Sequence, residues 1–122
     1  MRPLRSSVFE QQGKIVLLLI GHHSREEAAE CVPVARALFT KLGRCEFVPD
    51  LRRLSGFDTA ARVLWQEELA HFKGSIHTLT MIGGSPLTRM TGAAVCLFAG
   101  IKMRFVDSLE EAMVTTPAKR AS

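Results

Sequence analysis

Hydrophobic and polar positions follow two different periods along this chain, and the two periods alternate. Residues 15–20 are six consecutive apolar residues, a short run that is typical of a buried strand. Between residues 24 and 42, apolar residues recur every three or four positions, which indicates an amphipathic helix. The same reasoning predicts strands at 8–12, 15–20, 45–48, 75–82 and 101–105, a polar loop at 49–57, and helices at 24–42, from 58 or 59 to 73, at 85–99 and from 108 onward.

Local capping signals support these helices. Ser24-Arg25-Glu26-Glu27 and Ser108-Leu109-Glu110-Glu111 are both capping boxes, in which a hydroxyl and a carboxylate satisfy free amides at a helix start. Gly43 and Gly100 follow the last periodic residues of two helices and are expected to end them. Pro33 does not fit this pattern, because an internal proline is expected to kink a helix or to shift its start.

The order of elements predicts the fold class. A hairpin followed by alternating helices and strands, in the order β-β-α-β-α-β-α-β-α, indicates an α/β protein with a mixed, mostly parallel sheet of about five strands and about four helices. The chain has 122 residues, enough for one domain, which we expect at residues 8–113 with flexible tails at 1–7 and 114–122. Loops that follow parallel strands share the carboxyl edge of a sheet, so functional residues are expected there.

Charge and cysteine content narrow the function classes. The chain has 16 basic and 12 acidic residues, but residues 6–118 hold 12 of each, so the predicted domain is neutral and no nucleic-acid binding is expected. The three cysteines are isolated among apolar neighbours, which favours free, buried thiols in a reducing cytoplasm. The longest apolar run is too short to cross a membrane, and no targeting segment is evident.

Two loops at the expected carboxyl edge contain candidate site residues. Asp58 and Thr59 begin a helix, and they are either a helix cap or a regulatory phosphoacceptor with an adjacent acid. Gly83, Gly84 and Ser85 precede another helix and, with Arg89, form either a tight turn with a cap or an anion site. No histidine or cysteine spacing supports a metal site, no cofactor motif is present, and no nucleophile–base pair can be argued, so the chain is not expected to be an enzyme.

Several segments in their order along the chain resemble the STAS domain family, the fold of sulphate-transporter and anti-sigma-factor-antagonist domains, and more closely its SpoIIAA-like branch. The segments are Phe47-Val48-Pro49-Asp50-Leu51-Arg52, Phe57-Asp58-Thr59, Gly84-Ser85-Pro86-Leu87-Thr88-Arg89-Met90 and Phe105-Val106-Asp107-Ser108-Leu109-Glu110-Glu111-Ala112. In STAS antagonists an Asp-Ser pair starts a helix, and a partner kinase phosphorylates the serine. Asp58 and Thr59 fall on that pair, with threonine in place of serine and Ala60-Ala61 in place of the small polar and glycine residues that usually follow.

The resemblance implies a regulatory module that binds a protein partner, such as an anti-sigma-factor-like kinase, and that phosphorylation of Thr59 would switch. The partner surface is expected at the edge formed by the 49–59 loop and the helix after it, with Asp50, Arg52, Arg53 and Arg62, whose guanidinium groups would steer an acidic partner. A second copy of the chain is a further candidate partner. The main alternative is a lipid-transfer module of the CRAL-TRIO type, which an apolar cavity of about 300 Å³ or more would favour.

Overall fold

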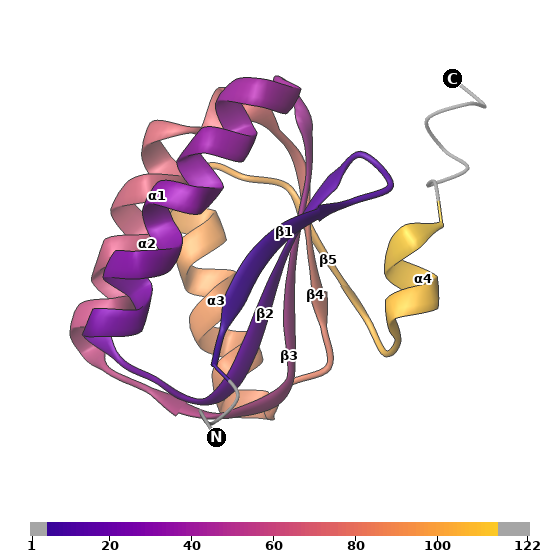
Figure 1. Cartoon of the computed structure of the whole chain (residues 1–122). Helices are drawn as coiled ribbons and strands as arrows, with labels where there is room; N and C mark the ends of the chain where they lie inside the picture. Colours follow the sequence, from indigo (N-terminus) through magenta and orange to yellow (C-terminus); the bar gives the residue numbers. More distant parts are fainter. Residues whose placement is uncertain (1–4, 115–122) are drawn as a thin grey trace.

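In residues 5–114, the part of the chain that the computed structural model describes, five strands form one sheet with helices packed on it (Figure 1). The strands are β1 (Ser7–Gln11), β2 (Lys14–His23), β3 (Cys45–Phe57), β4 (Ile76–Ile82) and β5 (Met103–Val106). The helices are α1 (Arg25–Leu42), α2 (Thr59–His71), α3 (Pro86–Ala99) and α4 (Leu109–Met113), with a 3₁₀ turn, η1 (Lys73–Ser75), after α2.

The sheet has the simple strand order β1-β2-β3-β4-β5. β1 pairs antiparallel with β2, and the other neighbours pair in parallel. Each parallel connection passes through a helix, because parallel strands need a crossover. The predicted α/β class, the mixed and mostly parallel sheet and the order of elements are confirmed.

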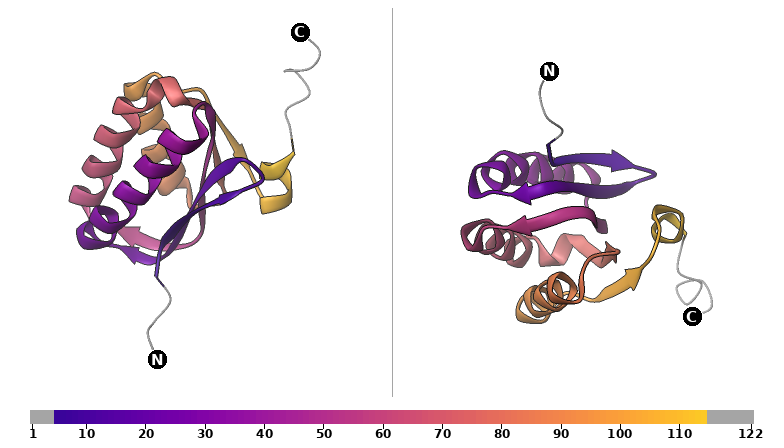
Figure 2. Two further views of the ribbon diagram at one scale, coloured as in Figure 1. Left: turned by 45° about the horizontal axis from the view of Figure 1, so that its top comes forward. Right: turned by 90° about the horizontal axis from the view of Figure 1, so that it is seen from below.

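Helices cover both faces of the sheet unequally (Figure 2). α1, α2 and α3 lie in a row on one face, and α4 lies alone on the other. The larger core fills the space under the three helices and centres on the aromatic side chains of Phe39, Phe47 and Trp65. A smaller apolar cluster lies beneath α4, where Val48 and Ile82 are fully buried. The carboxyl ends of β2, β3 and β4 therefore open onto the starts of α1, α2 and α3 at one edge.

The predicted loop at 49–57 is wrong, because β3 continues to Phe57. β2 is also longer than predicted, and its last residues hold the second half of β3 in parallel pairing as far as His23 opposite Phe57. Pro49 lies opposite Leu17 within this strand, although proline has no amide proton to donate. The pairing with β4 runs from Cys45 to Phe47 and resumes only at Asp50, so it omits the proline.

The predicted caps of α1 and α3 are confirmed. Ser24 and Ser85 accept hydrogen bonds from amides three residues later, and Gly43 and Gly100 follow the last helical residues with positive φ angles of 71° and 74°. Pro33 occupies an exposed position of α1, and the helix continues through it without a break. Packing on both sides of the proline, rather than local propensity, sustains this helix.

A row of polar side chains on the α4 face links four strands. Glu46 is buried, and its carboxylate contacts Lys14 Nζ at 2.7 Å and Arg104 Nη2 at 3.2 Å, while the Thr80 hydroxyl also donates to it. Burial alone would raise the pKa of Glu46, but the hydrogen bonds from Lys14, Thr80 and Arg104 outweigh burial and lower it. Arg104 also donates to the backbone carbonyl of Ala112, which fixes α4 to the sheet.

The described residues near the expected tails make contacts with the domain. Arg5 forms an ion pair with Glu30 at 2.7 Å, and the Ser6 hydroxyl accepts from the amide of Ile20 at 3.2 Å. The expected domain start at residue 8 therefore falls inside a packed segment that reaches at least Arg5. The remainder of the two expected tails, residues 1–4 and 115–122, lies outside the described residues.

Candidate functional site

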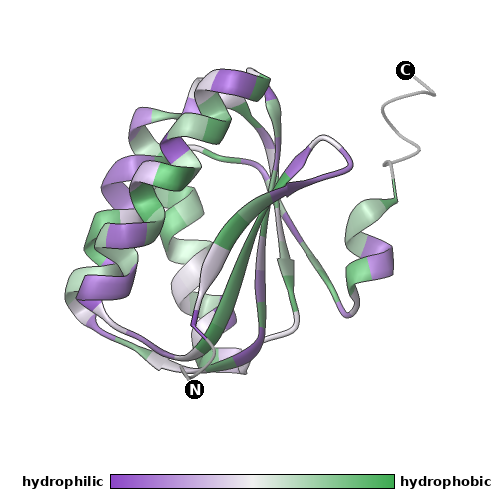
Figure 3. Ribbon diagram, viewed as in Figure 1, coloured by the Kyte–Doolittle hydropathy of each residue, from purple (hydrophilic) through white to green (hydrophobic). Residues whose placement is uncertain are grey.

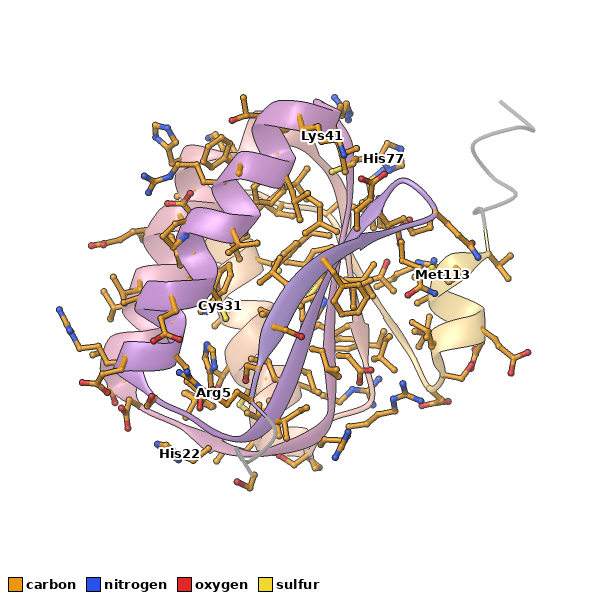
Figure 4. All side chains as sticks on the ribbon, viewed as in Figure 1. Arg5, His22, Cys31, Lys41, His77 and Met113 are labelled. Carbon is orange, nitrogen blue, oxygen red and sulfur yellow. The ribbon has the colours of Figure 1, made fainter. Side chains whose placement is uncertain are left out.

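The start of α2 presents an exposed hydroxyl at the carboxyl edge of the sheet. Thr59 is the first residue of α2 and is exposed to solvent, and Asp58 is the N-cap residue before it. His22, at the end of β2, lies at this same edge, at the opposite end of the molecule from Lys41 and His77 (Figure 4). The first amides of a helix lack partners within the helix and carry a partial positive charge, which suits an anionic group at this position.

Asp58 does not cap its own helix with its side chain. Its Oδ2 accepts from the amide of Arg25, the first residue of α1, at 2.9 Å, and its Oδ1 lies 2.7 Å from His22 Nε2. These contacts, with His22 contributing most, lower the pKa of Asp58. The amide of Asp58 in turn donates to the carbonyl of His23 at 3.0 Å. Asp58 therefore joins the starts of α1 and α2, and the side chain of its neighbour Thr59 is not needed for these contacts.

A buried histidine lies behind this edge, and the sequence reasoning assigned it no role. His23 is buried, its Nε2 accepts from Trp65 Nε1 at 3.0 Å, and its Nδ1 lies 3.3 Å from the Ser6 hydroxyl and 3.5 Å from Glu27 Oε1. Burial lowers the pKa of His23, and the nearby carboxylate of Glu27 opposes this effect only in part. Two adjacent histidines directly before a capping box were the only sequence signal for this arrangement.

The predicted partner-binding residues separate into two groups. Asp50 is only 4% exposed, and Arg52 binds its carboxylate through Nε at 3.0 Å and Nη2 at 2.8 Å. Burial would raise the pKa of Asp50, but the hydrogen bonds from Arg52 outweigh it and lower the pKa. The carboxylate of Asp50 is thus buried and already paired with Arg52, and its role in partner binding stays a prediction. Arg53 is exposed and Arg62 is half-buried, and neither forms an ion pair with a carboxylate among the described residues, although the charge of Arg53 helps to lower the pKa of Asp50.

The glycine loop before α3 is tightly packed against β3. Gly83 and Gly84 have φ angles of 64° and 97°, and a Cβ on Gly83 would lie 2.7 Å from Arg52 Cγ. The Gly83 amide donates to the carbonyl of Val106 at 2.9 Å, and the Ser85 hydroxyl accepts from the amide of Thr88 at 3.2 Å. The Gly83 amide is thus engaged in the turn, and the Ser85 hydroxyl caps α3.

Arg89 lies beside this loop. Its guanidinium lies over the ring of Phe105, 4.3 Å from the ring centroid, and its buried Nε has no hydrogen-bond partner among the described residues. The Cγ of Arg89 would lie 3.4 Å from a Cβ built on Gly84. The glycines serve as a turn in this structure, and an anion site at Gly83, Gly84, Ser85 and Arg89 stays a prediction.

A small apolar cavity lies between the sheet and the helices α2 and α3. Its volume is about 120 Å³, and its walls include Phe47, Trp65, Met81 and Cys96. An open groove of about 430 Å³ runs along the outside of α2 and α3. Cavity and groove share the side chains of Arg62, Thr91 and Val95, so they meet where the two helices part.

The cysteines, the metal-ligating side chains and the lengths of the helices can also be compared with the sequence predictions within residues 5–114. The three cysteines, Cys31, Cys45 and Cys96, are free and buried, as predicted, and burial raises the pKa of Cys31 and Cys96 to about 11. Within the described residues, no group of three or more metal-ligating side chains comes together. No helix in this part of the chain is long and apolar enough to cross a membrane.

Comparison with known proteins identifies the fold. No protein-family model and no curated protein matches the chain. A DUF3478-family protein with a SpoIIAA-like fold from Shewanella loihica PV-4 superimposes with a TM-score of 0.71 and 12% identity, over 93% of this chain and 96% of the other. The unphosphorylated form of the anti-sigma factor antagonist SpoIIAA gives a TM-score of 0.64 and 18% identity, over 95% and 96% of the two chains. This chain has a SpoIIAA-like fold.

The match extends over nearly the whole chain, so the resemblance predicted from the sequence is confirmed at the level of the fold. The SpoIIAA-like fold places a strand end, Thr59 and the start of α2 at the carboxyl edge of the sheet, as the resemblance implied. At 12% and 18% identity the likeness concerns the fold alone. The role of each residue at this edge has to be argued from its own geometry.

Proposed function

We propose that this chain is a non-enzymatic regulatory module that binds a protein partner through the exposed start of α2. The observation that carries the proposal is the separation of roles at this helix start. Asp58 makes the structural contacts, whereas Thr59 presents a solvent-exposed hydroxyl at the first helical position. The likeness of the fold to the anti-sigma factor antagonist SpoIIAA, whose structure is that of its unphosphorylated form, supports a regulatory role.

Phosphorylation of Thr59 would be the switch of this surface. A phosphate would add about two negative charges at a helix N-terminus, where the free amides favour it. Arg62 lies three residues further on, within reach on the same helix face, and among the described residues its guanidinium donates to the amide oxygen of Gln66 at 3.0 Å. Asp58 would repel the phosphate, but its charge is already bound by His22 and the Arg25 amide.

The positive charges of Arg53 and Arg62 would determine which kind of partner binds. Arg53 and Arg62 form no ion pair with a carboxylate among the described residues, so the unphosphorylated surface favours an acidic partner. A phosphate on Thr59 would cancel part of this positive charge. We therefore expect phosphorylation to weaken binding of an acidic partner through both charge repulsion and pairing with Arg62.

The test compares partner retention by purified variants in extracts of the native cell, with quantitative mass spectrometry. Thr59→Glu is expected to reduce retention of the partner by about tenfold, as a loss of roughly 1.4 kcal/mol would do. Thr59→Ser should behave as the wild type. Thr40→Glu is the matched control, because Thr40 is an exposed threonine near the C-terminal end of α1, away from the start of α2. Equal retention by Thr59→Glu and Thr40→Glu would contradict the proposal.

The apolar cavity supports a second candidate, the binding of a small apolar ligand. Its volume of about 120 Å³ is below the roughly 300 Å³ at which ligand sites usually begin, so the structure favours partner binding over a lipid-transfer role. A cavity of this size still suits a molecule such as benzene or xenon. Cys96 lines the cavity, and Cys96→Leu should fill it and abolish binding of such a probe. Cys96→Ala enlarges it and should keep binding; equal probe binding by the two variants would refute this candidate.

A further inference from the structure

α3 carries an unusual exposed apolar stripe. The side chains of Leu87, Met90, Leu97 and Phe98 are 71%, 68%, 84% and 71% exposed, although all are large and apolar. Together with Ala94 they recur at the spacing of one helix face, opposite the buried residues that anchor α3 to the sheet. Figure 3 shows the C-terminal half of α3 in green, whereas α1 alternates between green and purple. We call these five residues the α3 stripe.

The area of the α3 stripe is comparable to the largest apolar patch that a monomer usually leaves exposed. Four large apolar side chains at this exposure present on the order of 500 Å², within the range of the largest patch on a typical monomer, and such patches usually have a function. The groove of about 430 Å³ adjoins the stripe, since Met90, Ala94 and Phe98 line both. Residues 115–122, Thr-Thr-Pro-Ala-Lys-Arg-Ala-Ser, contain no large apolar side chain that could cover it.

We propose that the α3 stripe is the contact between two copies of this chain, packed antiparallel about a two-fold axis near the middle of α3. Leu87 and Phe98, the large side chains at the two ends of the stripe, lie at equal distances along the sequence from that point. An antiparallel pair centred between Gly92 and Ala93 places Leu87 opposite Phe98 of the second copy, and Thr91 opposite its Ala94. Large side chains thus meet at both ends, and small ones in the middle let the helices approach closely.

The charges of α3 fit a second copy better than a charged partner. α3 contains no acidic residue, and its one basic residue, Arg89, is turned away from the stripe onto Phe105. Two such stripes can pack without burying an unpaired charge, which is costly in an interface. Two copies would bury on the order of 1,000 Å² from the stripe alone, the lower limit for a specific interface. The stripe shares no residue with the proposed partner surface at Thr59, although Arg62 of that surface lines the adjoining groove. Each proposal is tested with its own variants, so either can fail without the other.

Analytical ultracentrifugation of the purified chain tests the proposal. At about 100 µM protein, the wild type is expected to sediment at about twice the monomer mass of 13.5 kDa and to dissociate on dilution. Leu97→Glu and Phe98→Glu should both sediment as monomers at the same concentration, with unchanged far-ultraviolet circular dichroism, because both side chains are exposed. Val34→Glu is the control, since Val34 is an exposed apolar residue on α1, and it should remain dimeric.

A cross-linking measurement locates the axis. Ala94→Cys places an exposed thiol beside the proposed axis, and a short bis-maleimide should join two copies of this variant. Ala29→Cys, exposed on α1, should give little product, and the native thiols are buried. A monomeric wild type, a dimer that survives Leu97→Glu and Phe98→Glu, or equal cross-linking of the two cysteine variants would each overturn the proposal. A monomer whose stripe binds lipid vesicles would also overturn it.

Discussion

The buried histidine behind the carboxyl edge predicts a specific loss of stability between neutral and mildly acidic pH. Trp65 Nε1 donates to His23 Nε2, so this nitrogen must be unprotonated and the ring proton lies on Nδ1. Protonation would place a second donor against the Trp65 N–H and a charge in a buried site. Burial accordingly lowers the pKa of His23 in the folded state.

The sign of the effect follows from proton uptake. The unfolded chain binds a proton on His23 below a pKa of about 6.5, whereas the folded chain resists this, so stability is complete above that pKa and falls as the pH decreases. If the folded state took up no proton, lowering the pH from 7.5 to 5.5 would cost about 1.4 kcal/mol through His23. This value is the upper limit, and the Glu27 carboxylate, which favours protonation, reduces it.

Urea unfolding followed by tryptophan fluorescence measures this loss directly, because Trp65 is the single tryptophan of the chain. His23→Gln is the matched variant, since its amide oxygen can accept from Trp65 but cannot take up a proton. The pH dependence of the variant's stability contains the contributions of all other groups, because both proteins keep them. Asp58 and its contact with His22 are among these groups. The wild type should lose up to about 1.4 kcal/mol more than the variant between pH 7.5 and 5.5. An equal loss in both proteins, or a wild type more stable at pH 5.5, would refute the reasoning.

Three further predictions concern the sheet, the glycine loop and the thiols. Glu46→Gln should lower the free energy of unfolding by about 2 kcal/mol at pH 7, because its basic partners lose a buried counter-charge. Because the pKa of Glu46 is lowered in the folded state, the wild type should lose this advantage in urea titrations as the pH falls below the pKa of an unfolded glutamate, about 4.3. Gly84→Gln should destabilise by about 1–2 kcal/mol, because of its positive φ and a Cβ contact of 3.0 Å with Leu51, and phosphate calorimetry on the wild type decides whether the loop also binds an anion. Cys31 and Cys96, with pKa values of about 11, should react with a thiol reagent at pH 8 on the order of 100-fold more slowly in the folded chain than in urea.

Local sequence signals were sufficient for the helices and insufficient for β3. Ser24 and Gly43 set the bounds of α1, and Ser85 and Gly100 set those of α3, because caps act within a few residues of the helix end. Residues 50–57 read as a loop, since they are mostly polar. They form a strand because β2 runs on to His23 and offers its backbone, a pairing between segments more than 30 residues apart.

The candidate site shows the same division between local and distant causes. The exposed position of Thr59 followed from its place at the start of a helix. The burial of Asp50 did not, because it depends on the folding back of Arg52 and on the neighbouring strands. The exposed stripe on α3 was also missed, since Leu87, Met90 and Leu97 have the spacing of a core-facing helix surface and the sequence cannot tell which face of an apolar helix meets the sheet.

The contacts of Asp58 explain why a switch at Thr59 need not disturb the fold. A residue that caps its own helix is usually tied to the first turn, and a charge beside it would disrupt that cap. Here the Asp58 carboxylate is committed to the Arg25 amide and to His22, both on elements that precede β3 in the chain. The first amides of α2 are therefore not held by this carboxylate, and they are available to a group added at Thr59. Binding of a phosphate there would use amides that the fold leaves open, so the change would fall on the partner surface rather than on stability.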